Sequence, residues 1–196
     1  MKKNLIIAIL MTIATTVLLG IIYPLVVTGL AQVLFPRQAN GELIAANGKV
    51  AGSQLIAQAF TGPGYFHPRP SAVSYDPTNS NGSQLGPTNQ KLIDRVNAEV
   101  AADHAENPSV PVPVDLVTAS ASGLDPDITP ASAEFQLGSV AKERGATVEQ
   151  LRALVARYTV GRQFGILGEP RVNVLELNLE LDQRFPMKKQ VRADYP

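Results

Sequence analysis

The first part of the chain is continuously apolar. No charged side chain occurs between Asn4 and Pro36, and the centre of this run extends from Leu5 to Val27. An apolar run of 18 residues or more is typical of a transmembrane helix, so we expect a single helix from Leu5 to Phe35. At 1.5 Å per residue this helix would be roughly 46 Å long, which exceeds a hydrocarbon core of about 30 Å. We therefore expect it to tilt or to emerge on one side.

A cleaved signal peptide is the competing interpretation of the same segment. The chain starts with Lys2 and Lys3, and residues 29–31 form a weak small-x-small site. However, the apolar regions of signal peptides have only about 7–15 residues, so a retained anchor is favoured. The positive-inside rule then places residues 1–4 in the cytoplasm and the chain beyond residue 36 outside it. We therefore expect a single-pass membrane protein.

Small side chains repeat at every fourth position of the apolar run, at Ala8, Thr12, Thr16 and Gly20. Such a stripe allows a second helix to approach closely, although these residue types are also common in membrane helices for no specific reason. Pro24 cannot donate a hydrogen bond to the carbonyl of Gly20, so we expect a kink nearby. Docking against a partner helix would satisfy that carbonyl again.

The pattern beyond residue 36 predicts one mixed α/β domain of the α+β kind, with a small sheet and three or four helices. Helices are indicated after three threonine caps: one from Thr88 to about residue 105, one from Thr129 to Gly145, and one after the capping box that begins at Thr147. We expect the domain to cover residues 36–182 and to be followed by a flexible tail, residues 183–196, that contains Lys188-Lys189.

Strands are indicated by alternating or turn-bounded segments. Asn47-Gly48 predicts a hairpin turn between residues 43–46 and 49–51. Residues 112–118 predict a strand, and residues 172–182 alternate like one. The alternation slips at residues 174–175, which indicates either a bulge or a switch to helix. Residues 53–60 fit either a short helix or a strand.

A long polar segment, residues 61–88, separates the hairpin from the first helix of the domain. Of its 28 residues, 18 are Gly, Pro, Ser, Asn or Thr. Loops of this length are usually functional or disordered. The apolar residues within it favour an ordered, packed loop: Tyr65, Phe66, Val73, Tyr75 and Leu85.

Composition excludes several classes of protein. The chain has 17 Lys and Arg against 17 Asp and Glu, which does not suit a basic nucleic-acid-binding protein. It contains no Cys, which excludes disulfides, thiolate metal sites and cysteine nucleophiles. No phosphate-binding or dinucleotide-binding glycine motif is present, so we expect no cofactor in this chain.

Candidate catalytic and metal-binding residues are few. His67 and His104 have no second ligand at metal-site spacing. Asp125 and Asp127 have the oxygen ligands that Ca²⁺ favours, but an Asp before Pro and an Asp before a helix are more typical of turns and helix starts.

A membrane-anchored hydrolase is an open alternative. It would use His67 as base, with Ser80 or Ser83 as nucleophile and Asp76 or Asp115 as the orienting acid. No nucleophile elbow supports this interpretation. The segment Tyr65–Arg69 has a second functional interpretation, as a binding surface, because aromatic and Arg side chains are enriched at protein interfaces. A solute-binding protein would use the same segment.

Several long segments resemble one family. Residues 52–72 (GSQLIAQAFTGPGYFHPRPSA), 80–89 (SNGSQLGPTN), 112–133 and 172–182 resemble the C subunit of the bacterial Kdp potassium-transporting ATPase, as does YPLVVTGL at 23–30. The resemblance covers nearly the whole chain, to about residue 182.

This resemblance implies a non-catalytic accessory subunit that assembles or stabilises an ATP-driven, high-affinity potassium uptake pump. The implied partners are a channel-like potassium-translocating subunit, a P-type ATPase catalytic subunit and a small membrane peptide, with ATP, Mg²⁺ and K⁺ bound by those partners. The family provides no catalytic residues. Its signature positions in this chain are structural or interface candidates: Gly62, Gly64, Tyr65, Phe66, Arg69, Asn81, Gly82, Ser83, Asn89, Thr118, Ser120 and Ser122.

Overall fold

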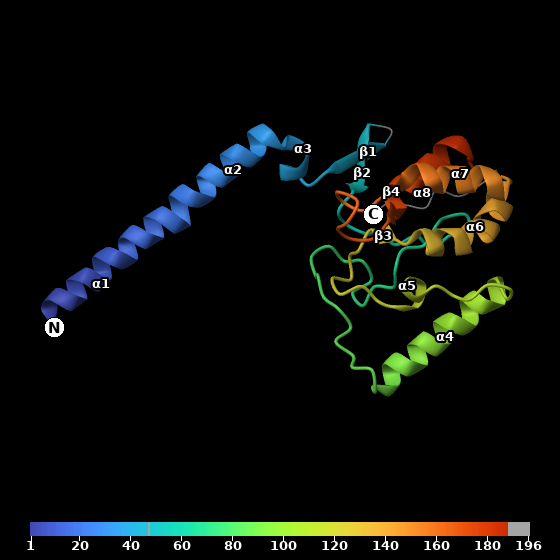
Figure 1. The fold of residues 1–196 in the computed structure, drawn as a ribbon, viewed down its shortest axis with the longest axis horizontal. Helices are drawn as coiled ribbons and strands as arrows, with labels where there is room; N and C mark the ends of the chain where they lie inside the picture. Colours follow the sequence, from blue (N-terminus) through green and yellow to red (C-terminus); the bar gives the residue numbers. More distant parts are fainter. Residues whose placement is uncertain (47, 188–196) are drawn as a thin grey trace. The chain divides into compact units, whose positions relative to one another are not determined.

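The computed structural model describes residues 1–46 and 48–187, which form two compact units (Figure 1). The first unit comprises residues 1–43 and is almost entirely helical. The second, which we call the head, begins at Ile44. Asn47 of the expected Asn47-Gly48 turn and the basic pair Lys188-Lys189 of the expected tail lie outside the described residues.

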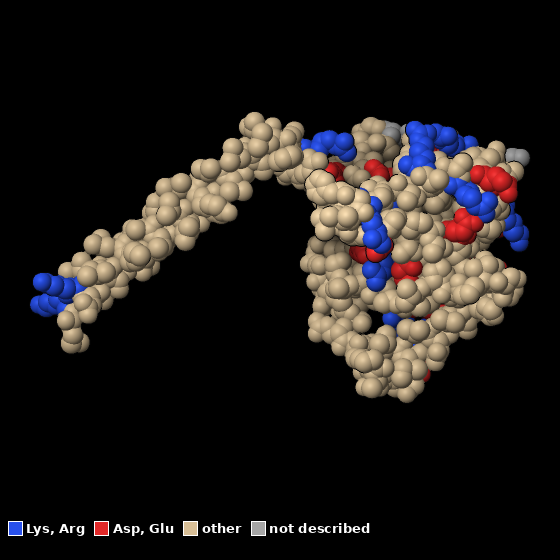
Figure 2. All heavy atoms as spheres, in the orientation of Figure 1, with Lys and Arg blue, Asp and Glu red and all other residues tan. Residues whose placement is uncertain are grey.

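The apolar run forms one continuous helix of 33 residues, Lys2–Leu34, with a mean hydropathy of 2.7 over its most apolar window. It consists of α1 (Lys2–Thr15), the π-helical η1 (Thr16–Ile22) and α2 (Tyr23–Leu34), and the short α3 (Pro36–Ala39) follows. Figure 2 shows the helix without charge beyond the lysines at its start. By length and composition it is able to cross a membrane.

The irregularity expected near Pro24 takes the form of the π-helical turn η1. Pro24 lies in the first turn of α2, and the preceding amide of Tyr23 donates to the carbonyl of Leu18, five residues back. A π turn accommodates the missing proline donor because the hydrogen-bond ladder shifts by one residue before it. Thr16 and Gly20 share a face, since a Cβ built on Gly20 would lie 3.9 Å from Thr16 Cγ2.

The head contains two small sheets. Strands β1 (Leu43–Ala46) and β2 (Lys49–Ser53) form the expected hairpin. The second sheet has the order β3-β5-β4, with β5 (Arg171–Asn173) in the centre and antiparallel to both neighbours. Its edge strands are β3 (Asp127–Ile128) and β4 (Thr159–Val160). Strands this short cannot stabilise a domain alone, so the core depends on helices.

The helices of the head are α4 (Gln90–Glu106), α5 (Val114–Val117), α6 (Pro130–Arg144), α7 (Val148–Tyr158) and α8 (Val174–Arg184). Helices α6, α7 and α8 pack together with β5, and Phe66 from the long loop completes their core. The expected mixed α/β architecture is confirmed. Helix α4 has no buried residue and lies apart from this core in Figure 1.

Two caps form where the sequence predicts them. The Thr129 hydroxyl accepts the Ser132 amide at the start of α6, and that helix stops at Gly145 in the left-handed conformation. Thr147 and Gln150 make both bonds of the capping box. The prediction for α4 was one residue early, because Asn89 rather than Thr88 is the cap. Asn is the stronger capping residue of the two.

The predictions for residues 112–118 and 53–60 require correction, whereas the switch to helix expected as one alternative at residues 174–175 is confirmed. Residues 112–118 are not a strand: Pro111 and Pro113 remove ladder donors, Pro113 caps the one-turn helix α5, and Asp115 turns inward. Residues 172–182 switch to helix α8 after Asn173, whose side chain accepts the Glu176 amide. Residues 53–60 are neither helix nor strand beyond the end of β2 at Ser53; they pair instead with distant segments, as in the Ala57 amide bond to the Leu124 carbonyl.

Candidate functional site: a groove beside helix α4

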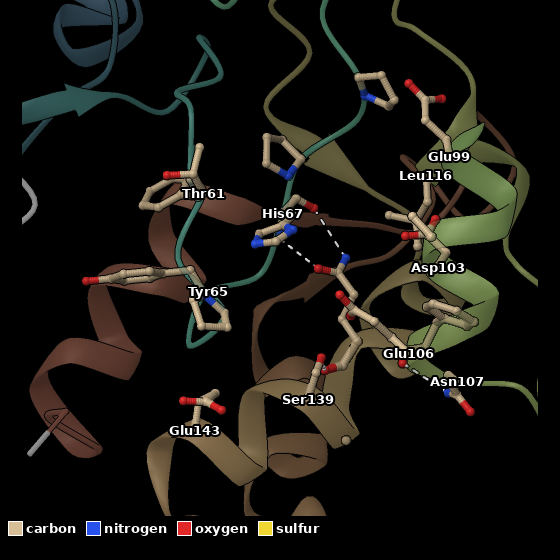
Figure 3. Close-up of a pocket in the computed structure, with 18 of the residues that line it drawn as sticks. Thr61, Tyr65, His67, Glu99, Asp103, Glu106, Asn107, Leu116, Ser139 and Glu143 are labelled. Carbon is tan, nitrogen blue, oxygen red and sulfur yellow. Dashed lines mark hydrogen bonds between the residues drawn. The ribbon is translucent and has the colours of Figure 1, made fainter. Parts of the chain in front are cut away.

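A groove of about 840 Å³ separates α4 from the rest of the head. Its walls are the loop from residue 59 to 70, the C-terminal half of α4, and the exposed side of α6. Figure 3 shows Tyr65 and His67 on the loop wall, with Asp103 and Glu106 on the α4 wall. The groove therefore joins the segment singled out from the sequence to a helix whose position beside it no sequence pattern predicted.

Two buried amide side chains hold the loop wall. Phe66 is fully buried; its amide donates to Asn178 Oδ1 at 2.9 Å, and its carbonyl accepts Asn178 Nδ2 at 2.9 Å. Gln136 of α6 forms a similar pair with the backbone of His67, at 2.7 and 3.2 Å. These side chains bind an irregular segment as a neighbouring strand would, so its buried backbone groups are satisfied.

A buried arginine fixes the end of the loop at Gly64 and Tyr65. Arg144 Nε donates to the Gly64 carbonyl at 2.6 Å, and its Nη1 lies 2.7 Å from Asp182 Oδ1. The guanidinium lies 4.5 Å from the centre of the Tyr65 ring, and Tyr65 Oη donates to Asp182 Oδ2 at 3.2 Å. A Cβ at Gly64 would lie 2.6 Å from Met187 Sδ and 3.3 Å from Arg144 Nε, so a larger residue there would require these side chains to shift.

The signature positions of the family lie in two parts of the head, the loop of the groove wall and contacts away from the groove. Gly62, Gly64, Tyr65, Phe66 and Arg69 lie in the loop that forms the groove wall. Within this group, Arg69 bonds Asp125 at 2.9 Å and the Thr118 carbonyl at 3.4 Å, while Gly62 accepts from the His67 ring at 3.2 Å.

The other candidates are structural contacts away from the groove. Ser80 Oγ donates to the Ser122 carbonyl, and the Ser120 amide donates to the Pro70 carbonyl. A Cβ at Gly82 would lie 2.9 Å from the Ala121 carbonyl oxygen. The remaining three make local bonds only: Asn81 accepts from Gln84, Ser83 from the Leu85 amide, and Asn89 caps α4.

The groove is acidic. Among residues 1–46 and 48–187, four carboxylates line it, from Glu99, Asp103, Glu106 and Glu143, against the one ammonium of Lys142. Burial raises the pKa of Asp103, and the neighbouring charges of Glu106 and Glu99 raise it further, against a smaller opposite effect of His67. Burial and Glu99 likewise raise the pKa of Tyr75, another lining residue. Neighbouring carboxylates that repel one another in this way favour a cationic occupant.

The residues of the hydrolase alternative do not come together. The His67 ring bonds the Gly62 carbonyl, and Ser80 and Ser83 have the partners given above. Asp76 accepts from Thr78. Asp115 is buried and accepts from the Thr129 amide, the Thr129 hydroxyl and the Ser132 hydroxyl, so it strengthens the cap of α6.

The two candidate calcium ligands are bound to arginines. Asp125 pairs with Arg69, and Asp127 with Arg171, each at 2.9 Å. Asp127 nevertheless has a raised pKa, because its burial outweighs the attraction of Arg171. Within residues 1–46 and 48–187, no three His, Asp or Glu side chains converge as a metal-binding group.

Sequence reasoning missed the residues that position the groove wall. Gln136, Arg144 and Asn178 are polar side chains on otherwise apolar helix faces. The available signal was Asn178 itself, because an amide between Leu177 and Leu181 on a buried face requires a hydrogen-bonding partner. Its partner lies 112 residues away in the chain, which periodicity does not reveal.

The architecture defines a class: one helix of membrane-spanning length joined to a small mixed α/β head that carries an acidic groove. Comparison with known proteins identifies the family. Residues 5–183 match the model of KdpC, described as the c chain of K⁺-transporting ATPase. The chain belongs to this family, as its resemblance in sequence predicts.

Curated relatives match along almost their whole lengths. A protein of Koribacter versatilis is 63% identical over 189 residues, which cover 95% of this chain and 98% of the relative. Relatives from Rhodospirillum rubrum and Acidobacterium capsulatum are each 58% identical, over 184 and 178 residues. These matches cover 92% and 90% of this chain and 95% and 96% of the relatives. All three are named potassium-transporting ATPase KdpC subunit.

Proposed function

We propose that this chain is a non-catalytic accessory subunit of an ATP-driven potassium uptake pump, in which it assembles or stabilises the complex. The observation that carries this proposal is the family match over residues 5–183, together with relatives named as subunits of a potassium-transporting ATPase. The partners would be a channel-like potassium-translocating subunit, a P-type catalytic subunit and a small membrane peptide. Those partners would bind ATP, Mg²⁺ and K⁺.

The helix Lys2–Leu34 supports a role as a membrane anchor. Lys2 and Lys3 favour a cytoplasmic N-terminus in the inner membrane, with the head on the opposite side. One helix cannot enclose an ion path by itself. Its face with Ala8, Thr12, Thr16 and Gly20 is the candidate surface for packing against a membrane helix of a partner, because small side chains allow close approach.

The acidic groove supports a second contact, made by the head. Within the described part of the chain its four carboxylates, of which Glu99 already pairs with Arg95, face one lysine, so a basic segment of a partner subunit is the occupant with matching charge. The aromatic and proline residues of the loop wall, Tyr65 among them, would supply the apolar part of the contact. Because hydrogen bonds already hold the backbone of Phe66 and His67, little conformational entropy would be lost there on binding.

Co-purification of the solubilised complex tests the helix contact. Thr16→Leu combined with Gly20→Leu adds bulk to the proposed packing face and should reduce recovery of the partner subunits. Ala14→Leu adds similar bulk outside that stripe and is the matched control. Equal recovery with both variants would refute the packing face.

Co-purification also tests the groove. Asp103→Asn with Glu106→Gln removes two charges and should weaken retention of partners, most visibly at raised salt. Asp94→Asn with Glu149→Gln removes two charges outside the groove lining and serves as control. The hydrolase or solute-binding alternative instead predicts that the chain purified alone hydrolyses a substrate or binds a small solute, with loss of that property in His67→Ala.

A further inference from the structure

The loop between β4 and β5 presents large apolar side chains to solvent. Phe164 is 83% exposed, Ile166 76% and Leu167 54%, and all lie within a stretch of four residues. We call residues 162–169 the apolar finger; it is the orange loop beside the β4 label in Figure 1. None of these residues lines the acidic groove, so the docking proposed above does not explain their exposure.

The tip of the finger has a backbone conformation that its sequence does not favour. Phe164 and Gly165 have φ values of +55° and +77°, and the Ile166 amide donates to the Gln163 carbonyl, as in a tight hairpin turn. Asn or Gly is the usual residue where Phe164 lies, and a bulky side chain there is strained. The strain is not offset by packing, because the ring is exposed. Such a residue indicates a functional requirement at the tip.

Part of the backbone of the finger is already hydrogen-bonded internally, which lowers the cost of entering an apolar medium. The amides of Gln163, Gly165, Ile166 and Leu167 all donate to carbonyls of residues 162–167. Backbone groups that enter a bilayer must be satisfied internally, and these four are. At the base, Arg162 pairs with Glu169 at 2.6 Å, and such a pair is able to remain at headgroup level while the tip enters.

We propose that the apolar finger inserts into the interfacial region of the bilayer that anchors the same chain. This rests on the membrane helix of the proposed function. From Leu34, the last residue of α2, to Ile44, the first of the head, the chain extends at most about 36 Å. The tether therefore holds the start of the head within this length of the end of the membrane helix. Three apolar side chains give only weak insertion alone, but the helix supplies the second anchoring signal.

A single engineered tryptophan tests the insertion, because the chain contains none. Phe164→Trp is reconstituted as the full chain in nanodiscs of phosphatidylethanolamine and phosphatidylglycerol. Its emission should be blue-shifted, quenched by lipids brominated near the headgroup, and protected from aqueous iodide, since an interfacial tip lies ~5–10 Å below the surface. Val114→Trp, at a position 72% exposed on α5, is the control and should remain accessible to iodide.

The possible results separate the two proposals. Adding Ile166→Asp to Phe164→Trp should reverse the blue shift and restore quenching by iodide. Chain that is not retained in the nanodiscs would contradict the membrane anchor. Retained chain in which Phe164→Trp is as accessible to iodide as Val114→Trp would overturn the finger proposal. Protection that appears only with partner subunits present, without quenching by brominated lipid, would overturn it as well, in favour of a protein pocket.

Discussion

Asn178 provides the sharpest test of how the groove wall is held. The variant Asn178→Leu keeps the volume of this buried side chain but removes both hydrogen bonds to Phe66. It leaves a buried amide and a buried carbonyl without a partner, at about 1–3 kcal/mol each. Leucine gains roughly 1–2 kcal/mol from apolar burial. We expect a net loss of about 0–5 kcal/mol in the free energy of unfolding, with a central value of roughly 2–3 kcal/mol.

The measurement combines denaturation with hydrogen exchange. Urea unfolding of the full chain in detergent is followed by circular dichroism. It gives the stability of the head when the membrane helix contributes the same signal in every variant. Native-state exchange should show faster exchange at the Phe66 amide, because its hydrogen bond to Asn178 Oδ1 is lost. Asn81→Leu is the control, because Asn81 is exposed and bonds only Gln84. Unchanged stability with a still-protected Phe66 amide would refute the role of Asn178.

Two further predictions concern charge and backbone conformation. The pKa of Asp103 is raised by burial and by Glu106 and Glu99, so the folded state binds its proton more tightly than the unfolded state does. That contribution is present below the unfolded pKa of about 3.9 and is lost as pH rises through the folded pKa. Asp103→Asn should therefore stabilise the fold more at pH 7 than at pH 4. Thermal melts at both pH values measure this, with Asp94→Asn as the control. A gain in stability that does not depend on pH would contradict the prediction. Gly123→Ala places a Cβ at φ +69° and 2.8 Å from the Asn81 carbonyl oxygen, whereas Gly145→Ala at φ +64° meets nothing within 4 Å. Gly145→Ala should lower the free energy of unfolding by about 1–2 kcal/mol from strain alone, and Gly123→Ala should lower it clearly more. Equal losses would show that the close approach at Gly123 is unimportant.

The parts of the fold that follow from local chemistry were predictable. Thr129 before Pro130, and Thr147 three residues before Gln150, cap helices by bonds within one turn, so their signals lie in adjacent residues. The apolar helix is equally local, because its length alone indicates a membrane span. These elements account for the starts of α6 and α7 and for the long helix of the first unit.

The parts that depend on distant partners were not predictable. Asp115 turns inward to the start of α6, which ends the alternation that suggested a strand at residues 112–118. The groove wall depends on Gln136 and Asn178, which bond a loop more than 60 residues away. The aromatic loop residues were recognised as a candidate surface, but the acidic helix opposite them has no motif that relates it to that loop.

The central claim is that this chain supports a potassium pump whose chemistry lies on other subunits. Its most direct test is K⁺-stimulated ATPase activity and complex recovery in solubilised membranes, with and without the gene for this chain. The account predicts that deletion lowers both, and that adding back the full chain restores them. A complex of unchanged yield and unchanged K⁺-stimulated activity without this chain would contradict the account.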